Sequence, residues 1–101
     1  MNMENERRRE LVYQALVDFG SGHLTYHFSD GTQQGGWFER KYIDSDWSAR
    51  ERRIRERRIR ERGIAPILTT GWIRECSVDD IVRIESDNHG EERRLLFRDE
   101  K

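Results

Sequence analysis

A row of arginines is the feature of this sequence with the clearest chemistry. Arg50, Arg53, Arg57 and Arg60 follow one another at spacings of three, four and three residues, which places them on one face of a helix. We call these four residues the Arg stripe. A guanidinium carries a permanent positive charge and a rigid fork of N–H donors that matches phosphate and carboxylate oxygens. The stripe therefore predicts a binding surface for an anionic macromolecule, with Trp47 as an additional aromatic contact.

The stripe belongs to a pentapeptide that occurs three times in residues 50–64. At 3.6 residues per turn, each unit advances about 140° around a helix axis. The repeated Ile54, Ile59 and Ile64 therefore point in different directions, which excludes a coiled-coil seam. Trp47 and Ile54 alone align as a narrow apolar strip. A helix this charged is also typical of a solvated surface without a ligand, so both interpretations stay open.

Charge is segregated along the chain. Residues 50–62 carry eight Arg and three Glu, whereas the whole protein has a net charge of −1. The acidic remainder contains carboxylates that could neutralise the stripe within the molecule. The carboxylates that could neutralise the stripe are those of Asp79, Asp80, Glu85, Glu91 and Glu92. A pI near 6.3 also argues against a dedicated nucleic-acid binder, for which values above about 9 are more typical.

No arrangement of residues predicts catalysis or a metal site. His23 and His27 are four residues apart in a predicted strand, where that spacing separates them by about 13 Å, too far to share one ion. The sequence contains no nucleophile elbow, no phosphate loop with its lysine and no conspicuous pair of carboxylates. We therefore expect a protein without metal or cofactor that is not an enzyme.

The compartment and size follow from simple counts. Cys76 is the single cysteine, so no intramolecular disulfide can form, as is usual in a reducing cytoplasm. Residues 1–10 are charged where a signal peptide is apolar, and no apolar run reaches the ~20 residues needed to span a bilayer. We expect a cytoplasmic protein without membrane contact. Its 101 residues predict one domain, residues 1–101.

These features predict a binding protein and not a catalyst. The first hypothesis is docking of the Arg stripe and Trp47 on nucleic acid, or on a complex that handles nucleic acid. The alternative is a protein–protein adaptor or stoichiometric inhibitor, of the kind encoded by phages and mobile elements. Such a protein would bind an acidic protein surface, or would use another contact surface such as an exposed β-edge or the hairpin face of His23, Thr25 and His27, and would not contact nucleic acid. The opposite charges of the two parts also leave self-association to a homo-oligomer open.

Two segments are predicted to be helical. Residues 5–19 fit both an amphipathic helix, with Asn5 as its cap and Gly20 at its end, and an alternating strand. The charged run before Leu11 favours the helix. The Arg-rich helix is expected at about 46–62, with a capping box between Ser48 and Glu51. Gly63 and Pro66 should end it.

The strands form hairpins in this prediction. Residues 23–38 should pair around a two-residue Asp30-Gly31 turn. That register places Leu24, Tyr26, Phe28 and Trp37 on the core face, with His23, Thr25 and His27 opposite. Residues 67–75 should form one strand with Gly71 as a bulge, and 80–98 a second hairpin. The expected fold is α+β, with an antiparallel sheet of four to five strands and one or two helices.

Overall fold

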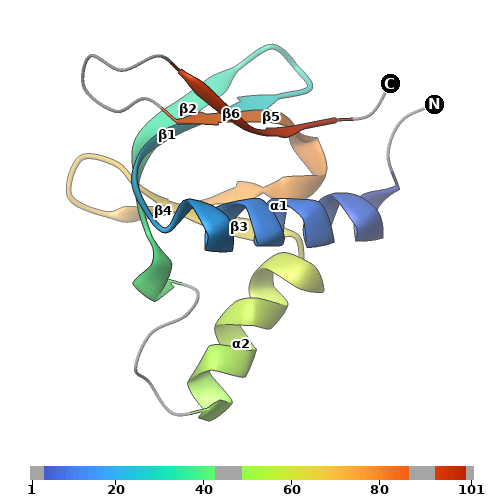
Figure 1. Ribbon diagram of the computed structural model, residues 1–101, viewed down its shortest axis with the longest axis vertical. Coiled ribbons are helices and arrows are strands. Elements are labelled where there is room, and N and C mark those ends of the chain that lie inside the picture. Colours follow the sequence, from blue (N-terminus) through green and yellow to red (C-terminus); the bar gives the residue numbers. More distant parts are fainter. Residues whose placement is uncertain (1–3, 43–48, 87–92, 100–101) are drawn as a thin grey trace.

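The computed structural model describes residues 4–42, 49–86 and 93–99 of the protein and shows an α+β fold (Figure 1). In chain order the elements are α1 (Asn5–Phe19), β1 (Ser21–Phe28), β2 (Gln33–Glu39), the 3-10 helix η1 (Arg40–Tyr42), α2 (Ala49–Arg60), β3 (Ile64–Leu68), β4 (Ile73–Ser77), the 3-10 helix η2 (Val78–Asp80), β5 (Ile81–Ser86) and β6 (Arg94–Arg98). The strands form one antiparallel sheet in the order β4-β3-β2-β1-β5-β6. The predicted fold class and the hairpin over 80–98, now β5 and β6, are confirmed.

The sheet has six strands because residues 64–77 contain a hairpin that the sequence analysis missed. The single strand predicted over 67–75 is wrong: β3 and β4 pair across a turn, with Leu68 opposite Ile73. Gly71 lies in this turn with φ +95°, a conformation that glycine adopts without strain. Pro66 pairs with Glu75 inside β3, where it was expected only as a helix stop.

The register of the first hairpin is one residue away from the predicted one. Tyr26 lies opposite Gln34, because the chain turns through three residues between Phe28 and Thr32. A two-residue turn of the expected kind needs positive φ at both of its positions, and within this turn only Gly31 has it. A slip of one residue exchanges the two faces of a strand. Phe38 consequently occupies the core, and the predicted core position of Trp37 is wrong.

Helix α1 confirms the helical reading of residues 5–19. Val12 and Leu16 are buried, and the Gly20 amide donates to the Leu16 carbonyl, which ends the helix. Asn5 is not the cap, since Glu4 occupies that position. The Asn5 side chain instead accepts a hydrogen bond from Arg8, which is itself buried.

Helix α2 ends at Arg60, two residues before the predicted end of 46–62, and the predicted start lies outside the described residues. Its end signal is confirmed, because Gly63 has φ +68° and its amide donates to the Ile59 carbonyl. The predicted capping box involves Ser48 and the Glu51 side chain, which lie outside the described residues. Ile59 is fully buried and anchors the helix, whereas Ile54, one repeat earlier, is 51% exposed. The C-terminal end of α2 lies against the body and the other end points away from it (Figure 1).

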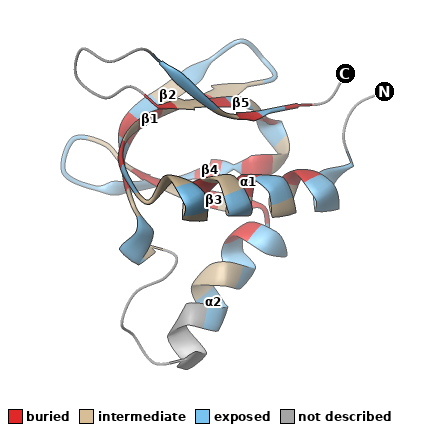
Figure 2. Cartoon of the chain, viewed as in Figure 1, coloured by how far each residue is buried: buried red, intermediate tan, exposed pale blue. Residues whose placement is uncertain are grey.

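The core fills the space between the curved sheet and the two helices (Figure 2). It consists of Val12, Leu16, Leu24, Tyr26, Phe38, Ile59, Ala65, Ile67, Cys76, Val78, Ile81, Ile84 and Phe97. The Tyr26 hydroxyl donates to the Pro66 carbonyl at 2.9 Å, so β1 is tied to β3 across β2. Within the described residues, no helix has both the length and the apolar character required to cross a bilayer.

Burial makes this core sensitive to alkaline pH. Desolvation raises the pKa of Tyr26 well above its ordinary value and also raises the pKa of the Cys76 thiol. Above pH ~10 the unfolded chain releases the Tyr26 proton while the folded protein keeps it, so stability falls by up to about 1.4 kcal/mol per pH unit. The test is urea denaturation between pH 8 and 11, which extends about one unit either side of the ordinary pKa values of thiol and tyrosine groups. Above pH ~10 the free energy of unfolding should decline less steeply for Tyr26→Phe than for the wild-type protein. Equal slopes for the two proteins would contradict this account.

Candidate functional site

The Arg stripe lines a groove between α1 and α2. Its described side chains share this hollow, of about 600 Å³, with acidic residues from both helices. The lining consists of Glu6, Arg9, Glu10, Arg53, Glu56, Arg57, Arg60 and Glu61. The described arginines of the stripe, Arg53, Arg57 and Arg60, therefore lie beside acidic side chains, and their contacts differ from one residue to the next.

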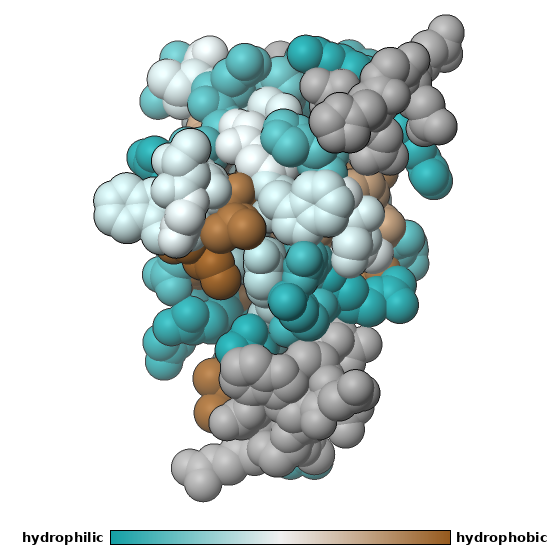
Figure 3. Space-filling model, turned by 90° about the vertical axis from the view of Figure 1, so that its left-hand side faces the viewer, coloured by the Kyte–Doolittle hydropathy of each residue, from teal (hydrophilic) through white to brown (hydrophobic). Residues whose placement is uncertain are grey.

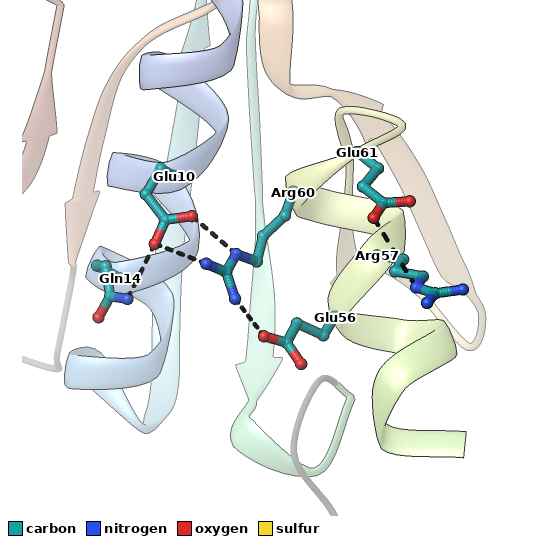
Figure 4. Close-up of polar contacts among 6 residues, drawn as sticks. All are labelled: Glu10, Gln14, Glu56, Arg57, Arg60 and Glu61. Carbon is teal, nitrogen blue, oxygen red and sulfur yellow. Dashed lines mark hydrogen bonds and ion pairs between the residues drawn. The ribbon is translucent and has the colours of Figure 1, made fainter. Parts of the chain in front are cut away.

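Arg60 is paired within the protein. Its Nε lies 2.7 Å from Oε2 of Glu10 on α1, and Nη1 contacts Glu56 one turn earlier on α2 (Figure 4). The guanidinium also lies over the Tyr13 ring, 5.1 Å from its centroid. Hydrogen bonds to Glu10 and Glu56 raise the pKa of Arg60. Arg60 thus joins the two helices through ion pairs, and its predicted role in ligand binding stays a prediction.

Arg53 and Arg57 are the exposed part of the stripe. Arg57 has Glu61 as a distant neighbour, with 3.8 Å between Nε and Oε1 and both side chains exposed (Figure 4). Arg53 is exposed and makes no ion pair among the described residues. The Arg50 side chain and all of Trp47 lie outside the described part of the chain, so their predicted roles stay predictions.

Two further α2 arginines, Arg55 and Arg58, attach the helix to the body. Arg58 pairs with Glu75 of β4 at 2.9 Å, and Arg55 donates to the Tyr42 carbonyl. Among the described residues, Glu10 of α1 and Glu75 of β4 contact the helix, and neither was among the acids expected from the sequence; Glu91 and Glu92 lie outside the described residues. Asp79 pairs with Arg9 at 2.7 Å, and Glu85 pairs within the sheet. The described arginines of α2 therefore form two groups. Arg55, Arg58 and Arg60 hold the helix against the body, whereas Arg53 and Arg57 are exposed.

A second surface is the face of the sheet that points away from the core, which we call the outer sheet face. His23 and Trp37 are direct neighbours there, and Trp37 in turn lies opposite Leu68. Trp37 is 40% exposed and Trp72, in the β3–β4 turn, is 71% exposed. Both indoles line one hollow of about 630 Å³. On the side from which this turn projects, hydrophobic atoms are bordered by side chains of intermediate hydropathy (Figure 3).

The opposite end of the outer sheet face is polar. His27, Arg83 and Arg98 are successive cross-strand neighbours on β1, β5 and β6. Like charges directly opposite one another destabilise a sheet, and here Glu85 compensates. Its Oε1 lies 2.9 Å from Nε2 of His27 and 3.0 Å from Nε of Arg83. Arg98 is exposed and forms no ion pair in the part of the chain that the structure describes.

The two tryptophans of the outer sheet face were missed because Trp37 was placed on the wrong side of the hairpin and Trp72 inside a strand. The turn between Phe28 and Thr32 was the signal that could have corrected the first error. Among the described residues, no three His, Cys, Asp or Glu side chains are grouped so that they could hold a metal ion. Comparison of the chain with protein-family models, with curated proteins and with solved structures found no match.

Proposed function

We propose that this protein is a non-enzymatic binding protein that docks α2 on an anionic macromolecule, with nucleic acid as the first candidate. The observation that carries the proposal is the exposed pair Arg53 and Arg57, four residues apart on one face of α2. Because Arg58 and Arg60 attach the helix to the body, the pair is presented on a fixed support. A fixed support reduces the entropy lost when the guanidiniums bind phosphates.

This arrangement favours weak binding without sequence preference. Two or three guanidiniums can neutralise phosphates, but phosphate contacts do not read bases. Glu10 and Glu61 beside the stripe oppose the approach of a polyanion. We therefore expect affinities in the range typical of non-specific binding, with Kd roughly 10⁻⁴ M at physiological salt.

Removing the exposed pair should change the salt dependence of binding. Each phosphate contact contributes about −0.9 to the slope of log K against log salt on duplex DNA, so Arg53→Gln/Arg57→Gln should make the slope shallower by about 1.8. Fluorescence anisotropy with a labelled duplex at several salt concentrations measures this. Circular dichroism checks that the helix is intact, which glutamine favours because it is a good helix former.

Arg62→Gln/Arg94→Gln is the matched control, since it removes the same charge at two exposed arginines outside the stripe. Neither of these side chains forms an ion pair among the described residues, so stability should change little. An equal change of slope in both double variants would mean that net charge and not the stripe determines binding. No binding to DNA or RNA at low salt would contradict the proposal.

In that case the alternative, a protein–protein adaptor or inhibitor, takes its place. The observation in its favour is that the edge strands β4 and β6 carry the exposed apolar residues Ile73 and Leu95. An exposed strand edge can pair with a strand from another protein.

A further inference from the structure

The hollow between Trp37 and Trp72 has features that the fold does not require. An exposed indole keeps a large apolar area in water, and Trp72 is 71% exposed. Both indoles line one hollow, together with Leu68, so a flat ring placed there would contact apolar surface. The Trp37 ring is fixed, because its Nε1–H donates to Oε1 of Glu39 at 2.9 Å. The Trp37 side of the hollow is therefore preorganised on strand β2.

Two adjacent glycines line the hollow, and the packing of the strands requires glycine at only one of the two positions. A Cβ on Gly36 would lie 2.4 Å from the Leu68 carbonyl oxygen, so the approach of β2 to β3 requires glycine. A Cβ on Gly35 would meet Thr25 at 3.4 Å and His23 at 3.8 Å, which are ordinary contacts. The φ angle of Gly35 is also not positive. The missing side chain of Gly35 thus leaves the hollow open without a backbone reason.

The charges around the hollow favour an anionic ligand. Arg74 lines it and is oriented by a hydrogen bond from its Nη1 to Gln34 at 3.0 Å. The nearby carboxylate of Glu39 is already engaged by Trp37 and Lys41, which lower its pKa. Further along the outer sheet face, beside His27 and so about 13 Å from His23 by strand geometry, lie Arg83, which is paired with Glu85, and Arg98. An aromatic platform with cations beyond it matches a chain of bases and phosphates.

We infer that the hollow lined by Trp37, Trp72 and Arg74 binds single-stranded nucleic acid, with one base against the two indoles and the adjoining phosphate on Arg74. Bases of a duplex are stacked on each other and do not reach such a hollow, whereas those of a single strand do. The inference rests on the proposed function in that the ligand is again nucleic acid, but the residues are different. The two surfaces can therefore fail separately.

The test compares a fluorescent oligothymidylate with its duplex on oligoadenylate. Wild-type protein should bind the single strand more tightly. Gly35→Val, which fills the hollow, and Trp72→Ala should each weaken single-strand binding roughly 5- to 150-fold, the factor that corresponds to one stacked base. Duplex binding should stay unchanged in both variants. Leu11→Ala, an exposed apolar residue on α1, is the control and should change neither.

Each outcome supports or overturns the inference. Normal single-strand binding by both hollow variants overturns it, while an effect of Arg53→Gln/Arg57→Gln in the same assay would leave the proposed function standing. Loss in the hollow variants without loss in the α2 variant supports the inference and contradicts docking through α2. Equal affinity of the wild-type protein for single strand and duplex, or no binding to either, overturns the inference. Thermal unfolding of Gly35→Val verifies that the variant is folded.

Discussion

Replacing Asp99 by alanine should destabilise the protein by about 3–5 kcal/mol. Asp99 is paired with Arg8 at 2.8 Å between Oδ2 and Nη2, and the two side chains are only 6% and 7% exposed. Arg8 also donates to the Asp79 carbonyl, so it connects α1 with η2 and with the chain after β6. Without Asp99 the Arg8 guanidinium stays buried and loses its counter-charge, and that uncompensated charge is the source of the cost.

Urea denaturation of Asp99→Ala measures the effect, with Glu75→Ala as its control. Glu75 pairs with Arg58 at 2.9 Å but is exposed, and its removal should cost less than about 1 kcal/mol. The double variant Arg8→Met/Asp99→Leu should recover most of the loss, because replacing both members of a buried pair by apolar groups is often neutral. Similar destabilisation by Asp99→Ala and Glu75→Ala would refute the assignment of this cost to burial.

Gly36→Ala should destabilise the protein by about 1–3 kcal/mol, and Gly36→Val by more. The added methyl would lie 2.4 Å from the Leu68 carbonyl oxygen and 2.8 Å from Cγ1 of Ile67. The first neighbour is backbone and cannot rotate away, so β2 and β3 would have to separate at the pair Trp37 and Leu68. The core around Ile67 would open with them.

Thermal unfolding of variants at the two neighbouring glycines provides the comparison. Gly35→Val places a residue with high strand propensity at an exposed strand position and should unfold at or above the wild-type temperature. Gly36→Val should unfold well below it. Equal melting temperatures for the two variants would show that the Gly36 contact relaxes without cost.

The helices and the fold class could be predicted because their signals are local. Apolar spacing and the glycines after each helix, Gly20 and Gly63, defined α1 and the end of α2. The register of the first hairpin could not be predicted in this way. It depends on whether the turn contains two residues or three, and this choice moved Trp37 out of the core and Phe38 into it.

The same distinction applies to the candidate site: contacts within one helix could be predicted, whereas contacts between elements could not. The pairs Glu56–Arg60 and Arg57–Glu61 follow from the spacing of four residues on one helix. The contact between Arg60 and Glu10 depends on how α1 packs against α2, which no local pattern encodes. This contact gives Arg60 a partner on α1 that the predicted stripe does not include. The Trp72 surface depends in the same way on a turn within a segment that was read as one strand.

The pentapeptide repeat also gives the protein an arm of adjustable length. Ile59 anchors α2, whereas the equivalent Ile54 in the preceding unit is exposed, so the unit before the anchor contributes no isoleucine to the core. Gain or loss of one unit at that end would move the helix start by about 7.5 Å and turn it by about 140°. Slippage within the repeated codons would thus change the reach and direction of the arginines while the core keeps its packing.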